Sequence, residues 1–280
     1  MSTILVFGAS GQVGRRLLPR LSSQHRVIAV SRALPHGDAD AGWIRGDLRD
    51  EDMNWPQAET VISLGPLDAF AAWLERNPAL ALRRVIALSS MSAESKRDSI
   101  DPRERALAER LRRAETTVTR VANLRAIAWT LFRPTLIYGA GADRSLAPIA
   151  RFARRWRLLP IPLGASGLRQ PVHVADLAAA CAAALANPAT FGKSYALGGG
   201  ERLRFDSMLL RLCRAVPGLV LPLPLPPIAL HLAARCWRGS PVGAGTLARL
   251  REPLIADNTD ATRDFGYAPA AFCPRDVLPR

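Results

Sequence analysis

The chain contains 280 residues, of which 49% are hydrophobic, and it carries a formal net charge of +14. This length and hydrophobic content are ample for a packed core in one large or two small domains. The sequence has no uninterrupted run of about 18 apolar residues, which argues against a membrane span. The first residues show neither the basic n-region nor the cleavage site of a signal peptide, so we expect no cleaved leader.

The positive charge comes almost entirely from arginine, because Lys96 and Lys193 are the only lysines among the 38 basic residues. Such a skew is typical of a GC-rich coding sequence, and aromatic residues that could stack on bases make up only 6% of the chain. We therefore expect no nucleic acid partner. An anionic small molecule is the favoured ligand, and the arginines within residues 151–157 are its candidate contacts.

The cysteines are widely scattered and include no Cys-x-x-Cys pair, so neither a metal site nor a disulfide framework is predicted. A reduced protein of the cytoplasm is the default expectation. One apolar segment, residues 218–237, contains four prolines that would break a spanning helix. Buried packing is the favoured interpretation of this segment, with contact to a membrane surface or to a partner as the alternatives.

Short apolar runs alternate with helical patterns through the first half of the chain. Near-continuous apolar strands between helices are typical of a parallel sheet that is covered on both faces. The expected strands cover residues 4–7, 26–31, 42–48, 60–65, 84–90 and 128–134, and the expected helices cover residues 14–23, 69–77 and 102–122.

Three glycines, Gly8, Gly11 and Gly14, lie at intervals of three residues between the first expected strand and the first expected helix. Glycine is entropically costly inside regular structure, so this spacing indicates a geometric need. A glycine-rich turn that leads into a helix N-terminus binds phosphate groups through its backbone N–H groups. In an open α/β sheet nucleotides bind at this place, so a cofactor phosphate is predicted here.

Several segments match motifs of a known family in the same order. The stretch GASGQVG (residues 8–14) resembles the glycine motif of extended and atypical short-chain dehydrogenases/reductases. Later motifs of the NAD-dependent epimerases/dehydratases of that family are similar to GDLRD (46–50), LFRPTLIYGAG (131–141), RQPVHVADLAAA (169–180), SYALGGGERLRFDSML (194–209) and DATRDFGYAP (260–269).

This resemblance covers almost the whole chain and implies an α/β fold, a Rossmann-like, doubly wound parallel sheet with a smaller C-terminal substrate-binding portion. Residues 1–139 would form the NAD(P)-binding domain. Residues 140–280 would complete the sheet, through about 168–200, and form the smaller lobe. Substrate would lie between the carboxyl ends of the strands and residues 140–167 and 202–250.

The resemblance also assigns a task to each glycine of the motif. Gly8 would make the tight turn, Gly11 would let the backbone approach the pyrophosphate, and Gly14 would permit close helix packing. Further donors to phosphate are expected from the backbone or hydroxyl groups of Ser10, Gln12 and Val13.

Beyond the glycine motif, Asp47 would accept from the adenine amino group, with Leu48 against the ring. A simple turn residue is the alternative interpretation of Asp47. The remaining predicted cofactor contacts follow later strands and are Leu64, Gly65, Ser89 and Pro134.

The end of the second strand sets the cofactor preference. NAD-dependent enzymes carry an acidic residue there, which binds the ribose 2′-hydroxyl. Here the strand ends in Ser31 and Arg32. A carboxylate would repel a 2′-phosphate, whereas an arginine pairs with it, so NADP(H) is predicted in preference to NAD(H). A solvated surface arginine is the alternative interpretation of Arg32.

The catalytic Tyr-x-x-x-Lys pair that the resemblance implies is absent from this chain. Family members often continue this motif as Tyr-x-x-x-Lys-x-x-x-Glu. Matching that glutamate to Glu109 puts Arg105 at the lysine position and Asp101 at the tyrosine position. The hydroxyls of Ser90 and Ser92 could orient a carbonyl, so the catalytic residues are unknown apart from the weak candidates Ser90, Ser92 and Arg105.

Two other motif residues are expected to be structural. His173 is predicted to make hydrogen bonds rather than catalyse, and Asp176 is predicted to cap the helix that follows it. Ser92 and Lys96 have the spacing of a Ser–Lys dyad, but no oxyanion-hole motif accompanies them.

Two functions therefore stay open at this stage. One is an NADP(H)-dependent oxidoreductase or epimerase-like enzyme with atypical catalytic residues. The other is a non-catalytic NADP(H)-binding sensor or accessory protein. Many members of the family pair through the long helix, and the arginine-rich face of residues 103–113 opposes such pairing here, so the oligomeric state is not predicted.

Overall fold

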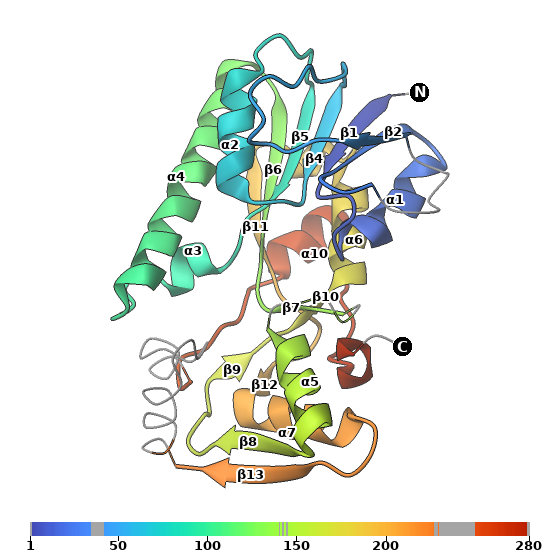
Figure 1. Ribbon diagram of the computed structural model, residues 1–280. Coiled ribbons are helices and arrows are strands. Elements are labelled where there is room, and N and C mark those ends of the chain that lie inside the picture. The colour runs from blue at the N-terminus through green and yellow to red at the C-terminus, as the bar shows by residue number, and fades with distance from the viewer. Residues whose placement is uncertain are drawn as a thin grey trace.

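The computed structural model describes residues 2–34, 42–139, 141, 143, 145–226, 229 and 250–278. They form a large lobe around a sheet and a small lobe below it (Figure 1). The strands of the large sheet are β1 (Thr3–Phe7), β2 (Arg26–Ser31), β3 (Gly42–Arg45), β4 (Thr60–Ser63), β5 (Arg84–Leu88), β6 (Ala128–Pro134) and β11 (Lys193–Leu197).

The large sheet is parallel throughout its described strands and has the order β11-β6-β5-β4-β1-β2-β3. The strand order reverses between β1 and β4, so the connections leave these two strands in opposite directions. In such doubly wound sheets, ligands bind in the crevice at the carboxyl ends of the strands at this reversal. The predicted α/β fold with a Rossmann-like parallel sheet is confirmed.

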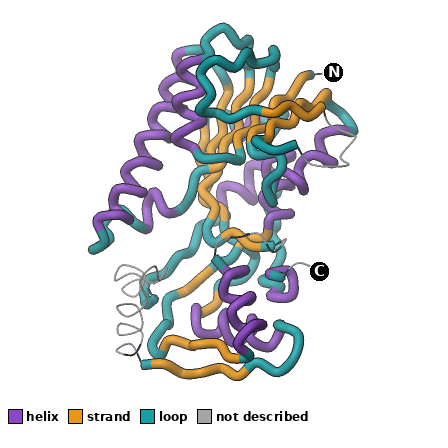
Figure 2. The backbone as a smooth tube through the Cα atoms, viewed as in Figure 1, coloured by secondary structure: helices purple, strands orange, loops and turns teal. Residues whose placement is uncertain are grey.

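Helices cover both faces of this sheet (Figure 2). Along β1, Ile4 and Val6 point into one core cluster, and Leu5 and Phe7 point into the other. This is the alternation that a strand buried on both faces requires. The first cluster is covered by α1 (Gly14–Ser22), α6 (Val174–Ala184) and α10 (Thr259–Phe265), and the second by α2 (Leu67–Arg76) and α4 (Pro102–Leu124).

The small lobe has a core of its own. Tyr138, Leu159 and Met208 are among the buried side chains that form it. Its elements are α5 (Leu146–Trp156), β8 (Leu158–Pro162), β9 (Leu168–Arg169), β12 (Leu203–Arg204), α7 (Phe205–Ala215), β13 (Leu221–Leu225) and the 3-10 helix η2 (Pro274–Val277). The short strands β7 (Ile137–Tyr138) and β10 (Val172–His173) pair between the lobes (Figure 1). The remaining short helices are α3 (Ser92–Ser95) and the 3-10 helix η1 (Pro188–Thr190).

The start of α6 differs in one respect from the sequence prediction. His173, not Asp176, caps this helix, because the His173 Nδ1 atom accepts from the Ala175 N–H at 3.3 Å. Asp176 lies in the first turn instead and accepts from the Ala270 N–H at 3.1 Å. The prediction that Asp176 caps the helix is therefore wrong, and the prediction of a hydrogen-bonding role for His173 is confirmed.

None of the described helices is long and apolar enough to cross a membrane. Of the apolar segment 218–237, only residues 218–226 and 229 are among the described residues. The rest of that segment lies outside them.

Candidate functional site

The glycine turn lies between β1 and α1, where two of its glycines meet strict steric limits. Gly8 adopts φ +72°, in the left-handed region that favours glycine. At Gly14, an added Cβ would lie 2.3 Å from the Ala9 carbonyl oxygen and 2.6 Å from the Gly8 carbonyl oxygen. The Gly11 N–H donates to the Gly8 carbonyl at 2.9 Å and closes the turn. The helix therefore starts in direct contact with the turn, which requires a residue without a side chain.

The end of β2 is tied to this turn. A hydrogen bond of 2.7 Å joins the hydroxyls of Ser10 and Ser31, and the Ser31 hydroxyl lies 2.7 Å from the Ala33 carbonyl. Ser31 is buried, whereas Arg32 is exposed. Ser31 thus positions the glycine turn, and the Arg32 guanidinium is accessible beside it.

The predicted adenine side of the site follows β3 and β4. Asp47 Oδ1 accepts from the Arg49 N–H at 3.0 Å, which is the turn geometry foreseen as the alternative interpretation of this residue. Leu48 is buried, and its Cδ1 atom would lie 3.6 Å from a Cβ added to Gly65. The Leu64 carbonyl carbon would lie 3.0 Å from a Cβ at Gly8. Leu48, Leu64 and Gly65 therefore lie together beside the glycine turn.

A buried ion pair lies under the ends of β5 and β6. The Glu115 carboxylate is bonded to Arg133 at 2.8 and 2.6 Å, and the Ser89 hydroxyl donates to it at 2.5 Å. Only 7% of the Glu115 side chain is exposed. The Glu115 carboxylate raises the pKa of Arg133 above its ordinary value. The Ser89 hydroxyl is thus engaged in the structure, and the Met91 N–H fixes the loop by donating to the Pro134 carbonyl at 3.0 Å.

The Glu115–Arg133 pair bears on how the family motif Tyr-x-x-x-Lys-x-x-x-Glu is matched to α4. The sequence prediction placed Glu109 at the glutamate position of this motif. Glu109 is exposed and pairs only with Arg113 among the described residues, whereas Glu115 is the buried glutamate of α4. With Glu115 at the glutamate position, Leu107 and Leu111 take the places of the tyrosine and the lysine. Glu115 therefore defines a second register for this helix beside the predicted one, because sequence spacing alone does not reveal which glutamate faces the sheet.

Asp101 and Arg105, which the match to Glu109 places at the tyrosine and lysine positions, lie away from the main cavity. Asp101 caps α4, with its Oδ1 atom accepting from the Arg103 N–H at 2.9 Å. The exposed Arg105 donates to the Ser99 carbonyl at 2.7 Å. Neither residue is among those that line the main cavity, so the structure does not bring Arg105 to Ser90 and Ser92.

The hydroxyls of all three tyrosines of the chain make hydrogen bonds within the protein. The Tyr138 hydroxyl accepts from the Cys273 N–H at 3.0 Å, and burial raises the pKa of this tyrosine to about 12. Tyr195 donates to Asp264 at 2.7 Å, and Tyr267 donates to the Gly198 carbonyl at 3.0 Å. No tyrosine is therefore placed as an acid or base in the main cavity.

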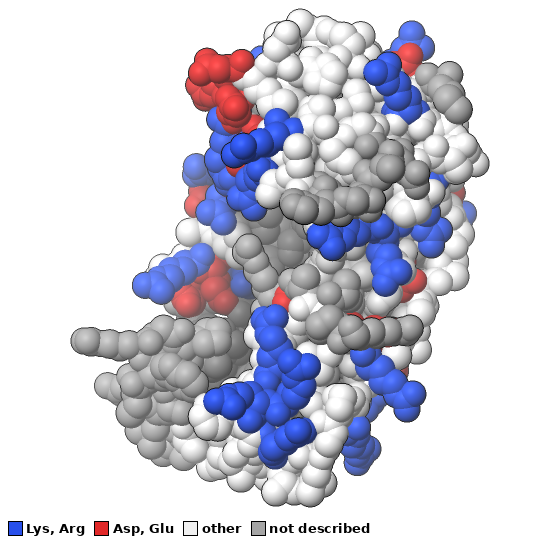
Figure 3. Space-filling view, turned by 45° about the vertical axis from the view of Figure 1, so that its right-hand side comes forward, with Lys and Arg blue, Asp and Glu red and all other residues white. Residues whose placement is uncertain are grey.

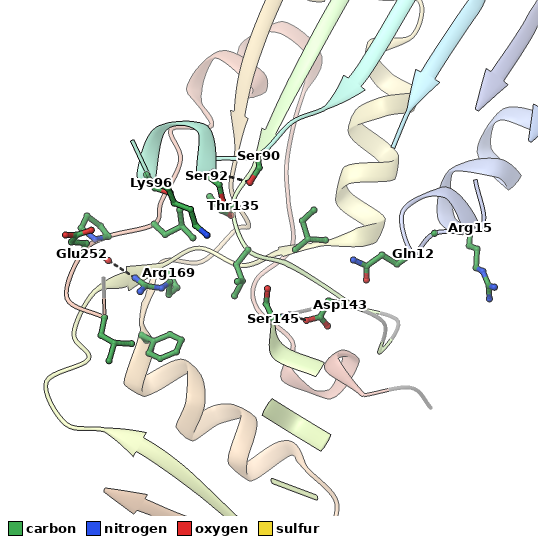
Figure 4. Close-up of a pocket in the computed structure, with 18 of the residues that line it drawn as sticks. Gln12, Arg15, Ser90, Ser92, Lys96, Thr135, Asp143, Ser145, Arg169 and Glu252 are labelled. Carbon is green, nitrogen blue, oxygen red and sulfur yellow. Dashed lines mark hydrogen bonds between the residues drawn. The ribbon is translucent and has the colours of Figure 1, made fainter. Parts of the chain in front are cut away.

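A cavity of about 1130 Å³ connects the glycine turn with the small lobe (Figure 4). Ser10, Gly11 and Gln12 line one side, and Ser90, Ser92, Ser95 and Lys96 line another. Figure 4 shows Gln12 and Lys96 pointing into the cavity from opposite sides. Arg15 of α1 also lines the cavity. The other walls come from the segment after β6 and from later parts of the chain, through Thr135, Leu136, Ile137, Asp143, Ser145, Arg169, Phe205, Leu250, Glu252, Pro253 and Leu254.

Two acceptor atoms in the cavity wall, Gln12 Oε1 and Asp143 Oδ2, are buried without a hydrogen-bond partner among the described residues. The other oxygen of Asp143 caps α5 by accepting from the backbone N–H groups of residues 145–147 at 2.6–3.0 Å. A buried polar atom without a partner is costly, so both atoms suit a ligand that brings N–H or O–H donors.

Two cations face the same space. Lys96 pairs with Glu104 at 3.5 Å. Arg169 stacks over Phe205 at 5.1 Å and donates to the Glu252 carbonyl at 2.7 Å. Burial lowers the pKa of Arg169 below its ordinary value. These groups give the far side of the cavity a positive character. Among the described residues, no cluster of His, Cys, Asp or Glu could hold a metal ion.

The arginines expected to contact an anionic substrate lie elsewhere. Arg151, Arg154, Arg155 and Arg157 are exposed on or just after α5, and none of them is among the cavity-lining residues. This expectation is wrong because the segment forms a helix with its apolar face in the small core and its arginines in solvent.

Comparison with known proteins identifies the fold. No family model matches the chain. A segment of 73 residues, 26% of this chain, is 41% identical to subunit 9 of the NADH dehydrogenase [ubiquinone] 1 alpha subcomplex, a mitochondrial protein of Arabidopsis thaliana. The match spans only 18% of the length of that relative.

Solved structures resemble the whole chain. A UDP-glucose 4-epimerase of Thermotoga maritima, determined with UDP-glucose, has a TM-score of 0.73 at 16% identity, over 98% of this chain and 96% of that one. A UDP-glucuronic acid 4-epimerase of Bacillus cereus in complex with NAD has a TM-score of 0.71 at 15% identity, over 98% and 94%. A short-chain dehydrogenase/reductase superfamily protein of Agrobacterium tumefaciens with bound NAD has a TM-score of 0.70 at 16% identity, over 99% and 94%.

The chain therefore has the fold of the NAD-dependent epimerases and of the short-chain dehydrogenase/reductase superfamily. The resemblance predicted from the ordered sequence motifs is confirmed at the level of the fold.

Proposed function

We propose that this chain is an epimerase-like protein of the reducing cytoplasm that binds NADP(H) at the glycine turn. One observation carries the proposal: a turn that only glycine can form at Gly8 and Gly14 opens into a cavity large enough for a nicotinamide and a substrate. Two of the proteins with this fold, from Agrobacterium tumefaciens and Bacillus cereus, were determined with bound NAD.

The residues of the turn fit such a cofactor. Val13 is the N-cap of α1 and Gln12 directly precedes it, so their backbone N–H groups lie at the helix N-terminus, where the helix dipole favours phosphate. Ser10 adds a hydroxyl that Ser31 holds in place. Gln12 Oε1 is a buried acceptor that no described residue contacts with a donor, which suits a donor of the bound molecule. When bound, NADP(H) would supply hydride chemistry at the cavity.

We assign the preference for NADP(H) to Arg32. It follows β2 directly and is exposed, and Ser31 stands where a carboxylate would bind the ribose of NAD(H). An arginine at this position would form charge-assisted hydrogen bonds to a 2′-phosphate.

The substrate is proposed to be a small anionic molecule in the same cavity. Lys96 and Arg169 supply positive charge there, and Ser90 and Ser92 supply hydroxyl groups after β5. Neighbours with this fold were determined with UDP-sugars, which are anionic and rich in hydroxyl donors. The buried Asp143 Oδ2 atom suits such a donor.

A specific observation favours the non-catalytic alternative. When the buried Glu115 is matched to the glutamate of Tyr-x-x-x-Lys-x-x-x-Glu, Leu107 takes the position of the tyrosine and Leu111 that of the lysine. Neither leucine can transfer a proton. Under the enzymatic hypothesis, protonation comes from a residue outside this helix face or from water. Under the alternative, the chain holds NADP(H) without turnover.

Parallel titrations test the cofactor assignment. NADPH and NADH are titrated into wild-type protein and into Arg32→Asp, and nicotinamide fluorescence is followed at moderate salt. We expect the NADPH to NADH affinity ratio to fall at least tenfold in the variant, because a carboxylate replaces a charge-assisted pair worth about 1.5–3 kcal/mol. An unchanged ratio would refute the role of Arg32. Oxidation of NADPH with a panel of carbonyl compounds separates the two functions, since only an enzyme consumes it.

A further inference from the structure

The end of the small lobe farthest from the large sheet is a two-stranded sheet of β8 and β13 (Figure 1). The strands are parallel, and Leu221 and Leu223 of β13 lie opposite Leu158 and Pro160 of β8. Side chains of directly paired residues point to the same face. The next residue of β8, Leu159, is buried in the core of the lobe, so the β13 leucines face away from that core.

This outer face exposes large apolar side chains. Leu221 is 60% exposed and Leu223 is 45% exposed. Just before β13, Leu219 is 79% exposed, and at the end of α5 Trp156 is 61% exposed. The Leu221 N–H donates to the Arg157 carbonyl at 3.0 Å, which brings the start of β13 beside the end of α5. A cluster of exposed apolar residues of this kind marks an interaction surface.

The edge of β13 that pairs with no described strand disfavours an added strand. Backbone groups of Leu221 and Leu225 make hydrogen bonds of 3.0 and 2.8 Å toward β8. The alternate residues, Pro222 and Pro224, therefore face the outer edge, and proline has no N–H to offer there. Pairing with a strand of a second copy or of another protein would lack these donors.

The surroundings of this face are basic and contain no acidic side chain in the nearby sequence. Arg154 and Arg155 of α5 and Arg214 of α7 are exposed. Residues 145–175 and 207–251 contain no aspartate or glutamate. On the side of the molecule shown in Figure 3, basic side chains gather over the lower lobe. Exposed apolar side chains with arginines on the neighbouring helices are complementary to an anionic lipid surface, into which leucine and tryptophan insert while arginine pairs with headgroups.

We propose that this end of the small lobe, defined by Trp156, Leu219, Leu221, Leu223 and the arginines Arg154, Arg155 and Arg214, docks on the surface of an anionic membrane. The apolar side chains enter the headgroup boundary, and the arginines hold the lipid phosphates. None of these residues lines the cavity of the proposed NADP(H) site, so the inference does not depend on cofactor binding.

Sedimentation with lipid vesicles tests this proposal. The full chain is mixed with sucrose-loaded vesicles of phosphatidylcholine alone or with an equal share of phosphatidylglycerol. We expect the protein to sediment with the anionic vesicles at low salt and to be released at high salt, because screening weakens the pairing. In the variant Arg154→Gln/Arg155→Gln, each lost arginine should lower the partition coefficient about fivefold. Leu221→Ser/Leu223→Ser should lower it roughly tenfold.

Matched controls come from the large lobe. Ile100 and Leu124 are 66% and 75% exposed, and Arg110 and Arg113 are exposed on α4. Ile100→Ser/Leu124→Ser and Arg110→Gln/Arg113→Gln should bind vesicles like the wild type, and all variants should keep its circular dichroism spectrum. The proposal is overturned if the wild type ignores anionic vesicles, or if both sets of variants lose binding equally.

Discussion

Replacing Gly14 by alanine tests whether the glycine turn has the tight geometry seen here. The new Cβ would lie 2.3 Å from the Ala9 carbonyl oxygen, which is backbone and cannot rotate away. The turn must move by about 1 Å to restore an ordinary contact of roughly 3.5 Å. Overpacking of this kind costs about 1–3 kcal/mol, and the better helix propensity of alanine returns up to about 1 kcal/mol. We expect the free energy of unfolding to fall by about 1–2 kcal/mol.

The same shift would move the backbone N–H groups of Gln12 and Val13 out of hydrogen-bond distance from a phosphate. Losing one charge-assisted hydrogen bond costs about 1.5–3 kcal/mol, so NADPH affinity should fall about tenfold to hundredfold. Urea unfolding and NADPH titration measure the two effects. Gly42→Ala is the control, because its added Cβ would lie 3.6 Å from the Val27 carbonyl oxygen, an ordinary contact. A Gly14→Ala protein as stable as wild type and with unchanged NADPH affinity would refute the reasoning.

Two further predictions concern charges in the large lobe. Glu115→Ala leaves the half-buried Arg133 without its bidentate partner. We expect urea unfolding to show a free energy of unfolding lower by about 3 kcal/mol. The control Glu109→Ala removes an exposed pair and should lower it by less than about 0.5 kcal/mol. Equal costs would contradict the buried register of α4. Hydrogen bonds from Lys193, Arg263 and Tyr195 hold the pKa of Asp264 well below its ordinary value. Its contribution is therefore present above the unfolded carboxyl pKa of about 3.9 and is lost as the pH falls below it. The urea midpoint should drop on acidification from pH 5 to pH 3, and drop less steeply in Asp264→Asn. Identical slopes would show that Asp264 does not link α10 to β11.

The large lobe was predictable because its signals are local. Apolar runs such as residues 26–31 and 128–134 coincide with β2 and β6, since a strand buried on both faces leaves little choice of residue type. The glycine spacing was equally informative, because the left-handed turn at Gly8 and the contact at Gly14 each exclude a side chain.

The site residues that the sequence missed depend on contacts between distant segments. Glu109 and Glu115 are both glutamates on one amphipathic helix, and only the position of Arg133 on β6 distinguishes them. A half-buried arginine implies a carboxylate partner on a neighbouring element, so Arg133 within LFRPTLIYGAG (131–141) was the available signal. Arg169 and Lys96 reach one cavity from opposite lobes, and no spacing in the sequence encodes that meeting.

The exposed arginines of α5 show a different limit. Their charge was evident, but the direction in which a helix presents it depends on which face is buried. Ala147, Ala150 and Ala153 form the apolar stripe of α5, so the arginines between them point to solvent and away from the cavity. Helical periodicity could have given this result if the segment had been recognised as a helix.

An equilibrium titration of the wild-type protein with NADPH, followed by nicotinamide fluorescence, measures whether the glycine turn holds NADP(H). We expect saturable binding of one NADPH per chain, tighter than that of NADH measured in the same way. Absence of binding to either nucleotide would contradict it, and would mean that Gly8, Gly11 and Gly14 serve the fold alone.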